Sequence, residues 1–283
     1  MGVYIRPQAL EDALAALSES PLAILAGGTD FYPARVGKPL DDDVLDITAL
    51  SALRGIERHG DTWCIGALAT WTDLIRAELP PAFDGLKSAA REVGGVQIQN
   101  AGTIAGNLCN ASPAADGVPS LLALDATIEL SSTRGTRAVP LADFITGNRS
   151  TVREADELAT GIVVPEPGAG TQSSFLKLGA RRYLVISIVM AGFVIEPEGE
   201  EVGRARIAVG ACSPVARRLP ALEAALMGQP LDAGLGDHVT ADHLATALAP
   251  IDDVRGSAAY RQDAALSVVR RGLSELGGQM AGG

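Results

Sequence analysis

The spacing of apolar residues near the start of the chain predicts a small unit of helices and strands. From Leu10 to Leu17 the apolar residues recur at intervals of three and four, which indicates a helix. The continuous apolar runs at 22–26 and 44–47 are typical of buried strands. With a short helix expected over 31–35, the two strands would lie parallel in a βαβ-like arrangement.

The pattern predicts two further groups of elements, separated by the glycine-rich linker at 168–170. Before the linker we expect strands at 63–67, 126–130, 137–139 and 158–164, helices at 71–78, 83–93 and 121–124, and a semi-extended segment at 96–100. After it, we expect three strands, at 174–178, 185–195 and 205–210. Three helices then follow, at 219–227, 240–248 and 258–276. Segregated strands and helices are typical of an α+β unit. We therefore expect a first domain over 1–170, with subdomains of about 1–56 and 57–170, and a second over 171–283.

Composition and charge narrow the class of protein. The 283 residues are 47% hydrophobic and 20% charged, an ordinary balance for a folded chain, and the formal charge of −11 argues against nucleic-acid binding. No apolar stretch is long enough to span a membrane and no signal-peptide pattern opens the chain, so a cytoplasmic location is expected. The three cysteines form no C-x-x-C pair, and His238 and His243 favour surface positions, so no metal site is expected in this chain.

Two segments of small residues carry the most specific signal. The run Ala-Gly-Gly-Thr-Asp at 26–30 follows the first apolar strand, and the run 100–116 holds two glycines among Thr, Asn and Ser. Small residues let the backbone approach a ligand closely, and N–H groups in tight turns bind anions. Ser112 and Pro113 are typical of a helix N-cap and first helical position. We infer that one elongated, phosphate-bearing ligand binds between the two segments. Because the chain is acidic, we expect backbone amides and helix ends, rather than a Lys/Arg cluster, to bind its phosphates.

Neither segment is a common nucleotide-binding motif. The first is not G-x-G-x-x-G, and it lacks the lysine that a P-loop needs after its second glycine. Asp116 closes the second segment, and its carboxylate can accept a hydrogen bond from a ribose hydroxyl or an amine. A negative charge that complements the start of a helix is an equally good interpretation.

The two segments together resemble a known family. Ala26-Gly27-Gly28-Thr29-Asp30 and Thr103-Ile104-Ala105-Gly106-Asn107 are similar to the paired flavin-binding motifs of the FAD-binding (medium) subunits of molybdenum hydroxylases, of the xanthine dehydrogenase and carbon monoxide dehydrogenase flavoprotein type. The resemblance covers the whole chain, because further matching runs follow in the expected order at 4–7, 110–116, 177–182 and 252–261.

The resemblance implies an α+β fold: a two-subdomain FAD-binding domain of the vanillyl-alcohol-oxidase/PCMH-like type, then a smaller α+β C-terminal domain with a three-stranded sheet and a helical bundle. It also implies noncovalent FAD, with the pyrophosphate bridged by the two segments. Cys109 lies beside the second segment, but packing of a small residue explains it better than covalent flavin attachment. The cofactor-binding residues expected on this basis are Leu25, Ala26, Gly27, Gly28, Thr29, Asp30, Phe31, Thr103, Ile104, Ala105, Gly106, Asn107, Ser112, Asp116, Ile162 and Lys177.

Several positions depart from the family pattern or carry an alternative. The family usually has glycine at Ala105, and alanine there would cost about 1 kcal/mol if the position needs a positive φ. Ile162 also fits a plain core position, and Lys177 a solvated strand end. Leu184 and Val185 stand where some relatives carry an acidic residue or a tyrosine facing the ring. That departure leaves reactivity toward oxygen or NAD open.

The function implied by the resemblance is electron transfer within a larger oxidoreductase. A large partner subunit would carry the molybdenum cofactor and a small partner subunit two [2Fe–2S] clusters. The FAD of this chain would pass electrons to an external acceptor, either a small molecule or a redox protein. The sequence offers no acid–base pair or nucleophile of its own. A stand-alone flavin-dependent oxidase and a non-redox scaffold subunit that keeps the fold are the alternatives.

Overall fold

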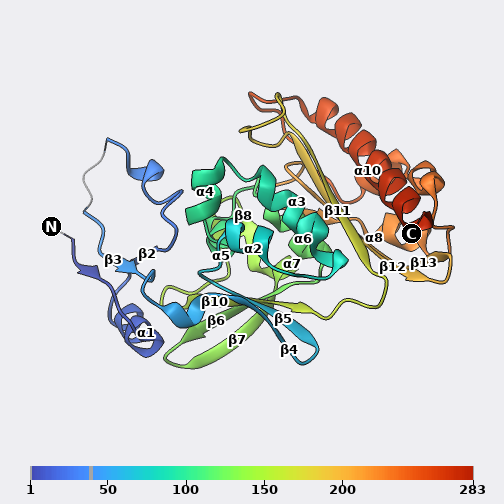
Figure 1. Cartoon of the computed structure of the whole chain (residues 1–283). Helices are drawn as coiled ribbons and strands as arrows, with labels where there is room; N and C mark the ends of the chain where they lie inside the picture. The colour runs from blue at the N-terminus through green and yellow to red at the C-terminus, as the bar shows by residue number, and fades with distance from the viewer. Residues whose placement is uncertain (1, 38–40, 283) are drawn as a thin grey trace.

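The computed structural model describes residues 2–37 and 41–282, which form three groups of elements in chain order (Figure 1). The first group is a parallel sheet in the order β1-β3-β2, with helix α1 packed on it. Its elements are β1 (Tyr4–Ile5), α1 (Leu10–Glu19), β2 (Ala23–Leu25), η1 (Pro33–Arg35), β3 (Val44–Asp46) and η2 (Ser51–Leu53). The parallel pairing of β2 with β3 confirms the prediction from the apolar runs, whereas the helix expected over 31–35 is only the short 3-10 turn η1.

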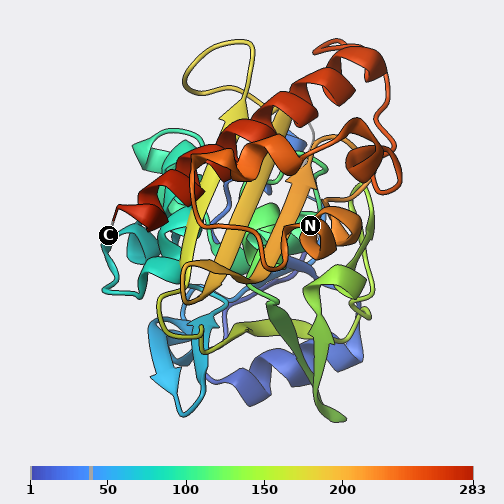
Figure 2. The same cartoon turned by 90° about the vertical axis from the view of Figure 1, so that its right-hand side faces the viewer.

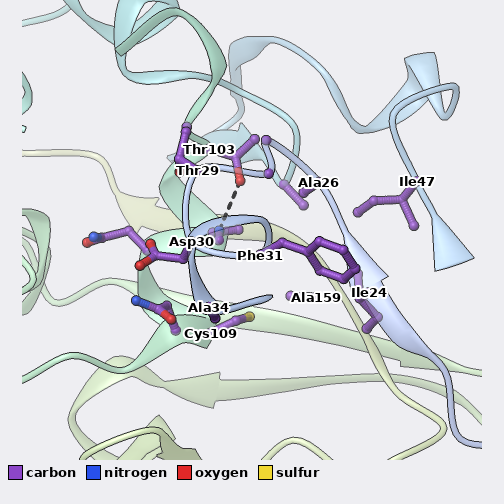
Figure 3. A pocket seen from close by; sticks show the side chains of 18 of the residues that line it. Ile24, Ala26, Thr29, Asp30, Phe31, Ala34, Ile47, Thr103, Cys109 and Ala159 are labelled. Carbon is purple, nitrogen blue, oxygen red and sulfur yellow. Dashed lines mark hydrogen bonds between the residues drawn. The ribbon is translucent and has the colours of Figure 1, made fainter. Parts of the chain in front are cut away.

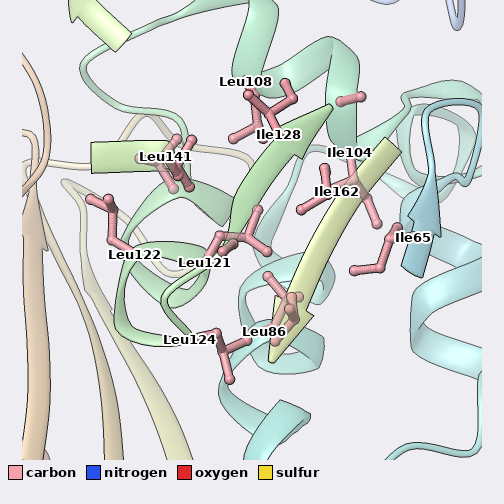
Figure 4. Close-up of a cluster of buried hydrophobic side chains, with 14 of the residues drawn as sticks. Ile65, Leu86, Ile104, Leu108, Leu121, Leu122, Leu124, Ile128, Leu141 and Ile162 are labelled. Atoms are coloured by element: carbon pink, nitrogen blue, oxygen red, sulfur yellow. The ribbon is translucent and has the colours of Figure 1, made fainter. Parts of the chain in front are cut away.

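The second group is built on a five-stranded antiparallel sheet in the order β4-β5-β10-β6-β7. Its elements are β4 (Ile56–His59), β5 (Thr62–Gly66), α2 (Trp71–Arg76), η3 (Pro81–Phe83), α3 (Asp84–Glu92), α4 (Val96–Ala101), α5 (Ile104–Asn110), α6 (Gly117–Ala123), β6 (Thr127–Ser132), β7 (Gly135–Pro140), α7 (Leu141–Phe144), β8 (Ile145–Gly147), β9 (Ser150–Thr151) and β10 (Leu158–Pro165). Buried apolar side chains from this sheet and its helices form one core (Figure 4).

Three sequence-based expectations in this group are wrong. Residues 96–101 form helix α4 rather than a semi-extended segment, and much of the small-residue segment at 100–116, interpreted above as tight turns, is helix α5. Ser112 does not cap a helix: its hydroxyl and carbonyl accept bonds from Ala114 and Ala115 in a turn, and α6 begins only at Gly117. The left-handed backbone of Ala111, with φ of 49°, ends α5 and separates the two helices.

The third group is an antiparallel sheet in the order β11-β12-β13-β14, crossed on one face by the long helix α10 (Figure 2). Its elements are β11 (Gln172–Leu178), β12 (Val189–Glu198), β13 (Glu201–Gly210), β14 (Arg217–Arg218), α8 (Pro220–Leu226), η4 (Ala233–His238), α9 (Ala241–Ala245) and α10 (Ala258–Ala281). The sheet therefore has four strands rather than the expected three, because the two-residue β14 pairs with β13.

This sheet is buried on both faces, which joins the third group to the second. Phe193 of β12 packs in the core beneath α10, whereas its neighbour Val194 belongs to the core of the second group. Helices α3 and α6 cover the inner face, as Figure 1 shows. The C-terminal sheet consequently holds a fixed position against the helices that lead into the cleft described below.

Two glycines of α10 give a matched test of this packing. A Cβ on Gly272 would lie 2.3 Å from the ring of Phe193, whereas a Cβ on the exposed Gly278 would meet only Ala233, at 3.6 Å. We expect Gly272→Ala to lower the free energy of unfolding by about 1–3 kcal/mol through overpacking. Gly278→Ala should raise it by about 0.5–1 kcal/mol through helix propensity. Urea unfolding of the two variants measures both values, and equal effects would contradict the close packing of α10 on β12.

Candidate cofactor-binding site

A cleft of about 610 Å³ lies between the turn that follows β2 and the start of α5 (Figure 3). Its volume falls within the range of small-molecule and cofactor sites. The lining includes most of the two small-residue segments: Ala26, Gly27, Gly28, Thr29, Asp30, Phe31, Thr103, Ala105, Gly106 and Asn107. The fold thus brings together two segments that lie more than 70 residues apart in the sequence.

The two segments touch through their backbones. A Cβ on Gly27 would lie 2.0 Å from the carbonyl oxygen of Ala101, so only glycine permits this approach. Gly28 has a φ of +73°, which places the turn in the left-handed region that favours glycine. Its carbonyl accepts a hydrogen bond from the amide of Tyr32 at 3.2 Å. The two glycines therefore have different roles, close approach at the first and backbone conformation at the second.

The turn after β2 presents consecutive free amides. From Gly27 to Phe31, five peptide N–H groups have no acceptor among residues 2–37 and 41–282. Buried or half-buried amides need a partner, and a run of them in a turn suits an anion. Because this turn lines the cleft, a phosphate-bearing ligand can satisfy the amides there.

The second segment is fixed by main-chain bonds on both sides. The amide of Trp71 donates to the carbonyl of Gly102 at 3.2 Å, and the amide of Ile104 donates to Ala69 at 3.0 Å. Thr103 then caps α5, its hydroxyl accepting from the amide of Gly106 at 3.1 Å. Ala105 sits in the first turn of this helix without a positive φ, so alanine carries no backbone cost there.

Asn107 lines the cleft, but its side-chain oxygen does not open onto it. The Oδ1 atom is buried, receives no hydrogen bond from a described residue, and lies 3.5 Å from where a Cβ on Gly117 would stand. The free amides and the close approach of small residues together fit a phosphate-bearing, nucleotide-like cofactor.

Residues that sequence reasoning missed complete the lining. An apolar wall is made by Ile24, Ile47, Ala67, Trp71, Val93, Ile98, Leu158 and Ala159, and a polar rim by Arg35, Asn110, Arg149 and Arg153. Ile162 is fully buried in the core, so strand β10 reaches the cleft through Leu158 and Ala159 instead. A bulge between Ala159 and Gly161 shifts the register of β10, and no local sequence signal reveals it.

Five other expected site residues lie outside the cleft lining. Leu25 and Ile104 are buried, Ser112 lies in the turn before α6, and Asp116 and Lys177 pair with each other. The Nζ atom of Lys177 lies 2.8 Å from Oδ2 of Asp116 and 3.5 Å from the carbonyl oxygen of Glu92. Lys177 and Glu92 line a second cavity of about 370 Å³, while the next residue, Val93, lines the cleft. Two consecutive residues at the end of α3 thus line different cavities.

The Asp116–Lys177 pair links the second and third groups of elements. Ser187 donates to Oδ1 of Asp116 at 2.6 Å, so both carboxylate oxygens are satisfied. Burial raises the pKa of Asp116, and the Lys177 ammonium opposes that rise. Buried ion pairs are costly to break from one side only, because the remaining charge loses its partner.

Cys109 faces the cleft as a protonated thiol. Burial raises its pKa to about 11, so little thiolate is present near neutral pH and the sulfur is a poor nucleophile.

The histidine His243 has a structural role: its ring accepts a hydrogen bond from the amide of Thr240 at 3.3 Å and completes the cap of α9. Across residues 2–37 and 41–282, no three His, Cys, Asp or Glu side chains gather into a potential metal site. Within the same ranges, no helix combines the length and apolar character needed to cross a bilayer.

The contact at Gly27 can be tested directly. Gly27→Ala should push the turn away from Ala101 and lower flavin occupancy of the purified chain at least tenfold, because the amides would leave the cleft wall. Gly278→Ala, on helix α10 away from the cleft, is the control, since a Cβ there meets only Ala233, at 3.6 Å. Gly28→Val is less informative, because its Cβ would lie 2.7 Å from the Tyr32 ring and at a positive φ whether or not a ligand binds. Unchanged flavin content in Gly27→Ala would contradict the assignment of this turn.

The buried pair predicts non-additive effects on stability. Asp116→Asn leaves the Lys177 ammonium buried beside a neutral amide and should lower the free energy of unfolding by about 3 kcal/mol. Adding Lys177→Met should recover part of that loss, because the uncompensated charge is removed. Urea unfolding of the single and double variants gives the coupling. Strictly additive losses would mean that the two side chains act independently.

Comparison with known proteins places this geometry in a family. Residues 1–167 match the FAD binding domain in molybdopterin dehydrogenase, and residues 174–276 match the CO dehydrogenase flavoprotein C-terminal domain. The chain is 39% identical over 207 residues to the nicotinate dehydrogenase FAD-subunit of Eubacterium barkeri, covering 68% of each chain. It is 31% identical to the glyceraldehyde dehydrogenase medium chain of Sulfolobus acidocaldarius, covering 96% of this chain and 97% of that one.

A solved structure agrees over the whole length. Carbon monoxide dehydrogenase from Hydrogenophaga pseudoflava, in a form that lacks the Mo-pyranopterin moiety of its cofactor, contains a chain with a TM-score of 0.88 and 30% identity. The alignment covers 97% of this chain and 96% of that one. Fold and sequence agree: this chain belongs to the FAD-binding medium subunits of the molybdenum hydroxylase family, which are components of multi-subunit dehydrogenases.

Proposed function

We propose that this chain binds FAD noncovalently in the cleft and relays electrons within a three-component oxidoreductase. A small partner subunit with two [2Fe–2S] clusters would supply the electrons, and a large partner subunit with a molybdenum cofactor would oxidise the substrate. The FAD would pass the electrons on to an external small molecule or redox protein. A cytoplasmic location is part of this proposal. The run of free amides from Gly27 to Phe31, opposite the capped start of α5, carries the proposal.

The residues of the chain would bind and orient the cofactor. The free amides of the turn 27–31, which lines the cleft, would donate hydrogen bonds to a pyrophosphate, and the apolar wall of the cleft suits an aromatic ring system. We assign Asp116 and Lys177 to the flavin end, because Lys177 contacts the carbonyl of Glu92, the residue before Val93 of the cleft wall. FAD supplies the redox chemistry when bound, and the protein supplies position and electrostatics.

The polar residues of the cleft suit a protein that binds the cofactor and leaves the redox chemistry to it. Histidine is absent from the described lining residues, Asp30 is their one carboxylate, and the one thiol, Cys109, is protonated. General acid–base or nucleophilic catalysis needs a positioned base or an activated nucleophile, and the lining offers neither in suitable form. A relay role therefore fits better than a stand-alone oxidase with its own substrate chemistry.

Flavin content is the first test. The full-length chain purified under native conditions should be yellow and should release FAD on denaturation, at close to one per chain. A chain stripped of flavin should regain it from added FAD, because the cleft is formed by the fold. A correctly folded, colourless chain that takes up no FAD would overturn the proposal.

Partner content separates the relay from its alternatives. Isolation of the tagged chain from its native host should also recover a molybdenum-containing subunit and an iron–sulfur subunit. Substrate turnover by the flavin-loaded chain alone would instead support an oxidase. A flavin-free complex with partners would support a scaffold subunit.

A further inference from the structure

We propose that Arg149 and Arg153, which line the same cleft as the free amides, bind the phosphates of the cofactor; this rests on FAD binding in the cleft. The sequence-based expectation is that backbone amides and helix ends, rather than a Lys/Arg cluster, meet the phosphates. The cleft has a different balance of charge from the whole chain. Three arginines and a single carboxylate, Asp30, are among its described lining residues, although the chain carries a net charge of −11.

Arg35 is already engaged within the protein. Its Nε donates to Asp42 at 2.6 Å, and its Nη1 donates to the carbonyl of Phe31 at 3.0 Å. The guanidinium also lies 3.8 Å from the centre of the Phe31 ring. A carboxylate partner neutralises this arginine, which leaves Arg149 and Arg153 as the cations to consider.

Arg153 is held in place without being neutralised. Its Nη1 donates to the carbonyls of Glu154 at 2.9 Å and Glu157 at 2.7 Å, and no described carboxylate forms an ion pair with it. Its Nε and Nη2 have no acceptor among residues 2–37 and 41–282. Neutral carbonyls fix the position of the guanidinium while its charge and its remaining donors stay available for an anion.

The turn that carries Arg153 is itself rigid. The buried carboxylate of Glu157 accepts two bonds from Arg137, at 2.6 and 2.8 Å, and one from the amide of Glu154 at 2.8 Å. The pKa of Glu157 lies below its usual range, mainly because of the hydrogen bonds from Arg137. Glu157 is thus committed to Arg137 and not to Arg153. The arrangement preorganises Arg153, which lowers the entropy lost on binding.

Arg149 is placed by the end of α5. Its amide donates to the carbonyl of Ala111 at 3.0 Å, and its backbone has a φ of 59°. Its guanidinium donates one bond to the side-chain oxygen of Asn110, which also lines the cleft. Like Arg153, it forms no ion pair with a described carboxylate. Two uncompensated guanidinium groups therefore line the cleft, and a pyrophosphate carries the matching two negative charges.

Rebinding of FAD to the full-length, flavin-stripped chain tests this assignment. Arg149→Gln and Arg153→Gln should each raise the Kd for FAD roughly tenfold, and the double variant by more, because each loses charge-assisted bonds. The Kd should also rise less steeply with salt in the variants, since a screened attraction has been removed. Arg217→Gln is the control, because Arg217 is exposed on β14 of a different sheet.

Two fragments of the cofactor separate a phosphate role from a structural one. ADP should compete with FAD for the wild-type chain and lose its effect in the double variant, while competition by adenosine should be unchanged. Arg153→Lys should recover part of the affinity by restoring the charge, and it covers the case in which the glutamine variants fold poorly. Equal losses for ADP and adenosine, or a double variant with wild-type affinity and salt dependence, would overturn the assignment. Failure of the wild-type chain to bind FAD would instead overturn the proposed function.

Discussion

The cleft depends on one contact between two backbones. Gly27 meets Ala101 and Gly102 with no side chain between them, and each partner is anchored in a different core. The turn after β2 continues from a strand of the parallel sheet. Gly102 is bonded through its main chain to Trp71 at the start of α2, and Ile104 to Ala69 just before that helix. Because both anchors are rigid, the free amides of 27–31 and the capped start of α5 are positioned before any ligand arrives. Such preorganisation is what lets uncharged groups bind an anion effectively.

The distribution of charge in the protein supports the same site. An acidic chain repels a polyanion at long range, but salt screens this repulsion beyond about 10 Å. Close to the cleft, Asp42 is paired with Arg35 and Glu157 with Arg137, which leaves Asp30 as the one carboxylate among the described lining residues. Two arginines lining the same cleft are held by carbonyl and amide oxygens instead. Net charge is therefore a poor guide to the local field, which depends on which ion pairs the fold has already completed.

Much of the fold follows from the sequence, because apolar periodicity reports burial directly. The parallel strands β2 and β3, the C-terminal sheet and helix α10 all come from continuous or helically spaced apolar runs. Helix α5 was missed because Gly106 and Asn107 have low helix propensity. Tertiary contacts decide there: Ile104 and Leu108, one turn apart, are both fully buried, and Thr103 supplies the cap. Local propensity underestimates a short helix that a core holds in place.

The remaining residues of the site could not be predicted from the local sequence pattern. The segment of Arg149 and Arg153 follows α5 by about 40 residues and reaches the cleft because the left-handed turn at Ala111 leaves its carbonyl free for the Arg149 amide. Strand β10 turns Leu158 and Ala159, rather than Ile162, toward the cleft because a bulge resets its alternation. Lys177 resembles a solvated strand-end residue in sequence, yet it is buried, since Asp116 and Ser187 converge on one point from separate segments. In each case a few hydrogen bonds or a register shift in the folded chain decide whether a side chain lies at the surface, in the core or at the site. Sequence alone locates the two glycine segments because their chemistry is local, and it misses the arginines because their environment is made by the completed fold.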